Sequence, residues 1–147
     1  MNFSTTIITD PNEKRRIIET CDDAFTISVT GRSNYEELLA KIDKFAVFLG
    51  AYTEAGEIAG YSAFYANDVE SRTAFITLFC ARKEMQRMHL GSGLRNATIE
   101  ESRRRGMKLS RLEVLKRDEG AVAFYKRCGF SITGDAGEAS YFMVREI

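Results

Sequence analysis

The stretch LEVLKRDEGAVAFYKRCGF, residues 112–130, predicts a strand that leads directly into a helix. Its first residues complete the segment LSRLEVL, residues 109–115, whose leucines and valine are typical of a strand. The next segment carries apolar and aromatic residues at the spacing i, i+3, i+4 and i+7, which places them on one face of a helix. Such a unit predicts a sheet with helices packed on it. The residues on the helix face are Ala121, Phe124, Tyr125 and Cys128.

A second junction of this kind lies upstream, in CARKEMQRMHLGSGLRN, residues 80–96. A strand ending near Ala81 and a helix beginning near Gly91 would aim free backbone N–H groups at one point, where the helix dipole also favours an anion. Gly91 and Gly93 lack a Cβ and so let an anion approach the chain. The segment therefore predicts an anion site, with a plain strand-to-helix turn as the alternative. Its charged residues are Arg82, Lys83, Arg87 and Arg95 against Glu84.

The known nucleotide loops do not fit this segment. No Gly-Lys-Ser/Thr follows the glycines, and the third glycine of a dinucleotide fingerprint would fall on Asn96. ATP and NAD are thus disfavoured as ligands of this loop.

Residues on both sides predict the rest of a mixed sheet with helices. Residues 10–21 predict a helix with Asp10 as its N-cap, and residues 33–46 predict a second helix. Three segments rich in aromatic and β-branched residues then predict an antiparallel meander, and residues 140–147 predict a closing strand. The meander segments are residues 46–53, 57–68 and 72–81.

Residues 91–106 predict a helix between the meander and the strand at 109–115. Glutamates and arginines recur in it at the spacing i, i+4, and Gly106 stands at the position of a C-terminal capping glycine. The three consecutive arginines therefore predict a solvated helix end. The expected ion pairs are Glu100–Arg104 and Glu101–Arg105.

Composition limits the classes of function. The chain has 147 residues, enough for one domain, and its 21 basic residues equal its 21 acidic ones. A balanced charge gives no general attraction to nucleic acid or to a membrane. The start of the chain lacks the features of a secretion signal, so we expect a cytoplasmic protein. The three cysteines lack the spacing of a zinc site or disulfide framework, so we expect apolar fillers and no metal.

Both junctions resemble the GNAT superfamily of acyl-CoA-dependent N-acetyltransferases. The coenzyme A loop of that family reads Gln/Arg-x-x-Gly-x-Gly/Ala, which is similar to this chain at Gln86 and Gly91, with His89 in place of the first glycine. The family's later strand-helix element is matched in register, with Asp118 in the place of an asparagine. The matched residues are Leu112, Val114, Ala121, Phe124, Tyr125, Gly129 and Phe130. The resemblance covers residues 46–147.

The resemblance implies the GNAT fold, an α/β (α+β) domain over residues 1–147 with a central mixed, mostly antiparallel sheet flanked by helices. It implies a pyrophosphate seat on the backbone amides of residues 87–93 and pantetheine beside the end of the preceding strand, in a gap between two strands that should form a pocket. The implied acetyl-CoA contacts are Phe79, Cys80, Ala81, Gln86, Arg87, Met88, His89, Leu90, Gly91, Ser92, Gly93, Asp118, Ala121 and Phe124.

The resemblance also implies catalytic roles. Tyr125 would be the general acid, because a phenol of pKa about 10 can protonate a departing thiolate of pKa about 8.5. A backbone N–H near Phe79 or Cys80 would stabilise the oxyanion, and the Cys80 thiol is not a nucleophile. Many relatives carry a carboxylate where this chain has Thr77, so the general base is open, and we name Glu113. Other choices are Asp68, Glu70 and a water relay.

The function implied is transfer of an acetyl group from acetyl-CoA to a primary amine by direct attack. The alternatives are a non-catalytic acyl-CoA-binding module and a structural protein that binds no cofactor. The acceptor is open, with a small-molecule amine favoured over a protein amine, and a homodimer is possible. His89 either donates to a phosphate or is an exposed residue at a glycine position. We expect residues 10–45 and 66–72 to form the acceptor pocket, with Tyr35, Tyr61 and Tyr65 as packing residues or as its lining.

Overall fold

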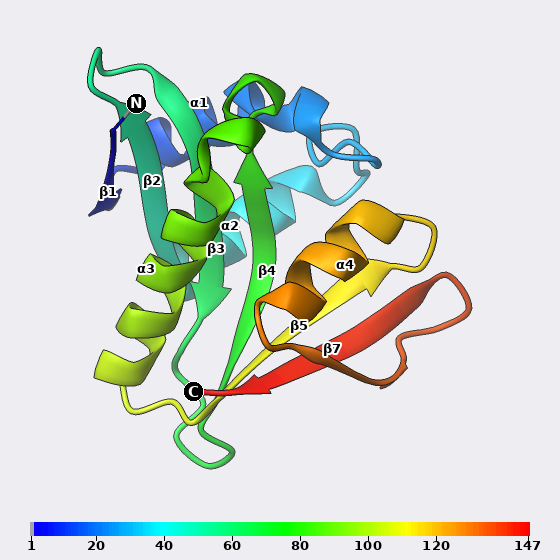
Figure 1. Ribbon diagram of the computed structural model, residues 1–147. Helices are drawn as coiled ribbons and strands as arrows, with labels where there is room; N and C mark the ends of the chain where they lie inside the picture. The colour runs from blue at the N-terminus through cyan, green and yellow to red at the C-terminus, as the bar shows by residue number, and fades with distance from the viewer. Residues whose placement is uncertain (1) are drawn as a thin grey trace.

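Seven strands form one mixed sheet in the order β1-β2-β3-β4-β5-β7-β6 (Figure 1). The computed structural model of the protein describes residues 2–147, and of Gln86, Arg87 and Met88 it describes the main chain only. The strands are β1 (Phe3–Ile7), β2 (Val47–Thr53), β3 (Ile58–Tyr65), β4 (Thr73–Ala81), β5 (Leu109–Leu115), β6 (Ser131–Asp135) and β7 (Ser140–Glu146).

The centre of the sheet holds its one parallel pair, β4 with β5, and every other neighbouring pair is antiparallel. The β4–β5 ladder begins at Thr73 and Leu109 and ends at Ile76 and Leu112. Both strands continue past this point, β4 to Ala81 and β5 to Leu115. The two strands therefore separate at their carboxyl ends.

An irregularity in β4 lies at the same level. Ala63 of β3 pairs with Leu78, but Phe64 pairs with Ile76, which leaves Thr77 as an extra residue in β4. An extra residue reverses the alternation of side chains beyond it. Ala74 and Ile76 accordingly lie in one core cluster, whereas Leu78 and Cys80 lie in the other.

Four helices cover the two faces of the sheet. Figure 1 shows α3 and α4 in front of the sheet and α2 behind it, on the side of α1. The core cluster on the α3 and α4 side contains Leu94 and Leu112, and the cluster on the α1 and α2 side contains Ile17 and Ile42. The helices are α1 (Pro11–Thr20), α2 (Tyr35–Phe45), α3 (Leu90–Arg104) and α4 (Glu119–Arg127).

Local sequence signals explain where these helices begin and end. The Asp10 carboxylate accepts a hydrogen bond from the Asn12 N–H at 3.0 Å and caps α1, as predicted. Gly106 has a φ of +87° just after α3 and ends it, also as predicted. One of the two ion pairs expected at this end is wrong, because Glu100 pairs with Arg103 rather than with Arg104. Glu101 binds both Arg104 and Arg105.

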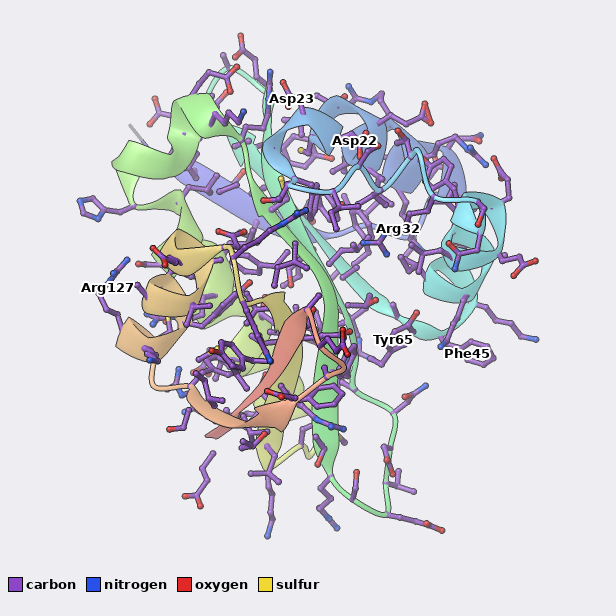
Figure 2. The ribbon with its side chains drawn as sticks, turned by 90° about the vertical axis from the view of Figure 1, so that its right-hand side faces the viewer. Asp22, Asp23, Arg32, Phe45, Tyr65 and Arg127 are labelled. Atoms are coloured by element: carbon purple, nitrogen blue, oxygen red, sulfur yellow. The ribbon has the colours of Figure 1, made fainter. Side chains whose placement is uncertain are left out.

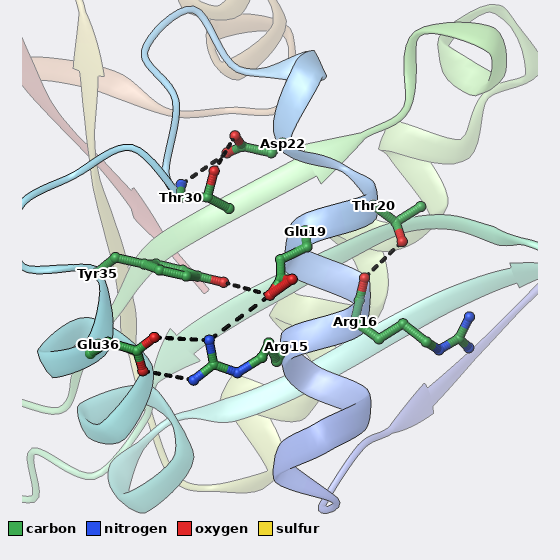
Figure 3. A network of polar contacts seen from close by, with 8 residues as sticks. All are labelled: Arg15, Arg16, Glu19, Thr20, Asp22, Thr30, Tyr35 and Glu36. Atoms are coloured by element: carbon green, nitrogen blue, oxygen red, sulfur yellow. Dashed lines mark hydrogen bonds and ion pairs between the residues drawn. The ribbon is translucent and has the colours of Figure 1, made fainter.

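Ion pairs fix α1 against α2 on the second face (Figure 3). The Arg15 guanidinium donates two hydrogen bonds to the Glu36 carboxylate, at 3.0 and 2.7 Å. The buried Lys14 ammonium lies 2.8 Å from the Asp43 carboxylate. The segment between the two helices is held by Asp22, whose carboxylate accepts hydrogen bonds from the main-chain N–H groups of Val29 and Thr30 at 2.7 and 3.1 Å.

The sequence analysis did not predict two of the strands, β1 and β6. Both lie at the edges of the sheet, and all five residues of β6 are exposed. Strands that bury no face lack the apolar alternation on which prediction depends. Three predicted buried cysteines are confirmed, since Cys21, Cys80 and Cys128 are all buried and free. Within residues 2–147, no helix has the length and apolar character needed to cross a membrane.

Candidate active site

The junction after β4 places the start of α3 beside the separated strands. The predicted loop from Arg82 is largely a short 3-10 helix, η2 (Lys83–Met88), and α3 begins at Leu90. His89 lies between them at a φ of +61°, is exposed, and makes no side-chain capping bond. The first N–H groups of a helix have no partner within it, so the N-terminus of α3 presents donors for an anion.

The two glycines of this junction have different surroundings. A Cβ on Gly91 would meet the Phe124 ring at 3.3 Å, so this glycine allows α3 and α4 to pack closely. A Cβ on Gly93 would meet nothing within 4 Å. Gly93 is thus the glycine with open space in front of it, and Gly91 has a packing role that the sequence did not indicate.

Of the other loop residues that the resemblance implies as acetyl-CoA contacts, the structure describes the side chains of Leu90 and Ser92 but not those of residues 86–88. The Leu90 side chain is 2% exposed and packs in the core, so only its main chain faces a ligand. Ser92 is half-buried. The side chains of Gln86, Arg87 and Met88 lie outside the described residues, and their predicted contacts stay predictions.

Aromatic rings connect β4 to α4 where β4 and β5 separate. The ring centroid of Phe79 in β4 lies 6.1 Å from that of Phe124 and 6.2 Å from that of Tyr125. Tyr125 also contacts Phe130 at 5.7 Å. On the α4 side the separation is thus lined by rings, and Ala121 packs against the same core. We predicted a pocket in the gap between the two strands. Aromatic side chains close this gap on the α4 side.

Burial raises the pKa of the Tyr125 phenol above the ordinary tyrosine value of 10.0, with smaller contributions from Cys128 and Asp118. The phenol is therefore fully protonated at neutral pH and available as a donor. Because of the raised pKa, proton transfer from Tyr125 to a thiolate is less favourable in free energy than transfer from an ordinary tyrosine.

Asp118 has a structural role at the N-terminus of α4. Its carboxylate accepts hydrogen bonds from the Ala121 N–H at 3.2 Å and from the Thr26 hydroxyl at 3.4 Å. Thr26 belongs to the segment between α1 and α2, so this second bond joins that segment to α4. Part of the acceptor capacity of Asp118 is thus used within the protein.

Cys80 points away from α4, into the cluster beneath α1. Its thiol donates to the main-chain oxygen of Cys21 at 3.6 Å, and its interaction with Cys21 and its burial raise the pKa of the Cys80 thiol. A thiol held in this way is not a nucleophile, in agreement with its expected role. Only its main chain faces the separated strands.

Glu113 lies one residue beyond the last β4–β5 pair. Its neighbours Leu112 and Val114 pack in the core under α3 and α4, so Glu113 projects from the opposite face of the sheet. It is exposed, and its carboxylate makes no hydrogen bond or ion pair in the described chain. Tyr125 and Glu113 therefore lie on opposite faces at the level where the strands separate.

The other acids named from the sequence are misplaced. Asp68 and Glu70 lie in the turn before β4, and Arg72 in that turn accepts at its main-chain oxygen from the Lys108 N–H at 2.7 Å. This turn lies at the opposite end of β4 from Cys80, because β4 runs from Thr73 to Ala81. The structure thus places residues 66–72 at the end of β4 away from the predicted coenzyme A contacts, and their part in an acceptor pocket stays a prediction.

The three tyrosines are packing residues. Tyr61 is 0% exposed and stacks on Phe48 at 5.2 Å, Tyr35 donates to Glu19 at 3.4 Å, and Tyr65 carries the Lys41 ammonium 5.1 Å from its ring centroid. Tyr61 is thus a core residue, and for Tyr35 and Tyr65 both alternatives stay predictions.

A cavity that the sequence did not indicate lies at the carboxyl end of β5. Its volume is about 310 Å³, and it opens beneath the segment between α1 and α2. Asp23 of this segment is exposed and makes no ion pair with the described residues, and Figure 2 shows it with Asp22 above the sheet, at the end of α1. No signal in the sequence brings residues 22–34 to residues 115–118. The cavity is lined by Ile27, Leu115, Lys116, Arg117 and Ala139.

Over residues 2–85 and 89–147, no group of His, Cys, Asp and Glu side chains is arranged to hold a metal.

Solved structures with the same architecture are known. The chain is similar over its full length to a PaiA N-acetyltransferase of Thermoplasma acidophilum in complex with coenzyme A, with 16% identity, coverage of 100% of both chains and a TM-score of 0.81. It is similar to a GNAT-family acetyltransferase of Streptococcus pneumoniae, with 20% identity, coverage of 99% and 100% and a TM-score of 0.74. It is also similar to the ribosomal-protein-S18-alanine N-acetyltransferase of Escherichia coli, with 18% identity, coverage of 98% and 94% and a TM-score of 0.75. These likenesses show the GNAT fold.

The family follows from the sequence model that matches the chain. The model described as Acetyltransferase (GNAT) family matches residues 15–130. The protein belongs to the GNAT acetyltransferase family. No curated protein sequence matches the chain significantly.

Proposed function

We propose that the protein transfers the acetyl group of acetyl-CoA to a primary amine by direct attack. The observation that carries this proposal is the separation of β4 and β5 after Ile76 and Leu112, with the N-terminus of α3 and Tyr125 beside it. A separated strand leaves main-chain groups for an extended ligand, and a helix N-terminus favours an anion. Acetyl-CoA has both parts, an extended pantetheine and a pyrophosphate.

The residues that would hold acetyl-CoA fit this shape. The first N–H groups of α3, from Leu90 to Gly93, would bind the pyrophosphate, and the open space at Gly93 allows its approach. The main chain of Phe79 to Ala81 would bind the pantetheine. When bound, acetyl-CoA supplies an activated thioester. A main-chain N–H of Phe79 or Cys80 would stabilise the oxyanion, as donors preorganised in a site of low dielectric do.

Two side chains would handle the protons. Glu113, on the open face of β5, would take the proton of the acceptor ammonium, because an alkylammonium of pKa about 10.4 is almost fully charged at neutral pH. Tyr125, on the α4 side, would donate its proton to the departing thiolate. Acid and base would thus act from opposite faces of the sheet, so that the amine would approach from the side without α4.

A second candidate function is a non-catalytic acyl-CoA-binding module. The observation that favours it is Thr77, which lies at the extra residue of β4 where many relatives carry a carboxylate. A threonine hydroxyl cannot act as a base at neutral pH.

Turnover and binding distinguish these functions. The protein is incubated with labelled acetyl-CoA and a panel of primary amines, and its melting temperature is measured with acetyl-CoA alone. An acetyltransferase labels at least one amine and is stabilised by acetyl-CoA, by about 2.7 kcal/mol at a hundredfold excess over Kd. Stabilisation without labelling indicates the binding module. A melting temperature that does not respond to acetyl-CoA contradicts both.

A further inference from the structure

The cavity at the carboxyl end of β5 has an apolar side and a basic side. Ile27, Leu115 and Ala139 form the apolar side. Ile27 is 49% exposed, so the segment between α1 and α2 presents a large apolar side chain to this space. Leu115 lies two residues after Glu113, and residues two apart on a strand share a face. The cavity therefore lies on the same face of the sheet as the proposed base.

The cavity also lies close to the thioester end of the site. Thr26, next to Ile27, donates to Asp118 at 3.4 Å, and Asp118 is near enough to Tyr125 to affect the pKa of its phenol. Glu113 lies where β4 and β5 separate, and about 7 Å of strand, at about 3.3 Å per residue, joins it to Leu115. A substituent of an acceptor whose amine is at Glu113 can thus reach this cavity.

The two cations of the cavity differ in their partners. The Lys116 ammonium lies 3.0 Å from the Asp135 carboxylate and 5.2 Å from the Tyr141 ring centroid, so its charge is satisfied within the protein. Arg117 is exposed and has no hydrogen bond or ion pair in the described chain. The nearest carboxylate in sequence, Asp118, is bound to the Ala121 N–H and to Thr26. Arg117 is therefore the free charge at this site.

We propose that the acceptor is an amine that also carries a carboxylate and an apolar side chain, as a hydrophobic amino acid does. Arg117 binds the carboxylate, because a guanidinium presents two parallel donors to its two oxygens. The apolar side chain packs against Ile27 and Leu115. One free cation matches one negative charge, which favours a carboxylate over a doubly charged phosphate. This inference rests on the proposed function and specifies its substrate.

The test compares L-leucine with L-leucinamide in the acetylation assay with labelled acetyl-CoA. The two differ only in the carboxylate, and the ammonium of the amide is the more acidic, so intrinsic reactivity favours the amide. We expect kcat/KM to be higher for leucine by about tenfold or more. A hydrogen bond between Arg117 and the charged carboxylate of leucine stabilises its complex by enough to give this factor. Arg117→Gln should abolish this preference by lowering kcat/KM for leucine alone.

The matched control is Arg127→Gln. Arg127 is also exposed and has no ion pair within the part of the chain that the structure describes, and Figure 2 shows it on the outer side of α4, pointing away from the segment between α1 and α2. This variant should keep the preference for leucine. Equal rates for leucine and leucinamide overturn the inference, as does a preference that survives Arg117→Gln. Acetylation of 3-methylbutylamine but of neither leucine compound overturns the inference and leaves the proposed function intact. Absence of all acetylation overturns the proposed function itself.

Discussion

The ring centroids of Phe79 and Tyr125 lie 6.2 Å apart, with their planes at 69° to each other. This contact joins β4 to α4 across the place where β4 and β5 separate, and it fixes the phenol beside the end of β4. Edge-to-face contacts of this kind contribute about 0.5–1.5 kcal/mol beyond their buried area, so the ring position is well defined. Several predictions depend on the position of this phenol and on its surroundings.

Tyr125→Phe removes the proposed acid and keeps the ring contacts. We expect kcat to fall by about a hundredfold or more, since positioned acids contribute about 10²–10⁴. The stabilisation by acetyl-CoA should not change. The control is Tyr52→Phe, because the Tyr52 hydroxyl donates to Glu13 at 2.7 Å away from this site. A Tyr125→Phe protein of unchanged kcat would show that the phenol is only a packing group.

The pH dependence of kcat follows from the raised pKa of Tyr125. The acid must be protonated to act, so its activity is lost only as pH rises through its folded pKa, which burial places above 10.0. We expect kcat to rise from acidic to neutral pH as the acceptor side loses its proton, and to show no descending limb below pH 10. The profile is measured at saturating acetyl-CoA. A descending limb at neutral pH would contradict the role of this phenol.

Glu113→Gln tests the base. We expect kcat/KM to fall by about a hundredfold at neutral pH, and the defect to shrink as pH rises, because the acceptor amine then loses its proton to solvent. Glu54→Gln is the control, since Glu54 lies exposed in the turn between β2 and β3. A defect that is the same at all pH values would assign Glu113 to acceptor binding instead.

Gly60→Ala tests the position of β4. A Cβ on Gly60 would overlap the main-chain oxygen of Cys80 and lie 3.2 Å from the Ala81 Cα. Main-chain atoms cannot rotate away, so we expect a loss of about 1–3 kcal/mol in the free energy of unfolding and weaker binding of acetyl-CoA. Denaturant titration measures the first and thermal shift the second. Gly120→Ala should be harmless, because its Cβ would meet nothing within 4 Å.

His89→Gly should stabilise the protein. His89 has a φ of +61°, a conformation that costs a residue with a Cβ about 1–2 kcal/mol relative to glycine. We expect the melting temperature to rise in His89→Gly but not in His89→Ala, which keeps the Cβ. Equal melting temperatures in both variants would show that the imidazole, and not the backbone, limits stability. Weaker binding of acetyl-CoA in both variants would instead assign the imidazole to phosphate binding.

The central part of the fold could be predicted because its strands and helices bury at least one face each. The alternation in residues 109–115 predicts β5, and the apolar face of residues 118–130 predicts α4, which ends three residues earlier, at Arg127. The edge strands could not be predicted, since β6 exposes all of its residues. At the site, Tyr125 and the start of α3 follow from local pattern. The cavity at Ile27 could not, because Thr26 and Asp118 are 92 residues apart in the chain.

The extra residue Thr77 has a consequence for how β4 can vary. With it, Phe79 faces α4 while Leu78 and Cys80 face α1. A regular ladder that kept Thr77 in line would exchange the two sets, turning the aromatic ring toward α1 and the thiol toward α4. The extra residue is thus as much a determinant of the geometry here as any side chain on the strand. A homologous design that removes the irregularity would have to shorten β4 by one residue, which would leave Leu78, Phe79 and Cys80 on their present faces.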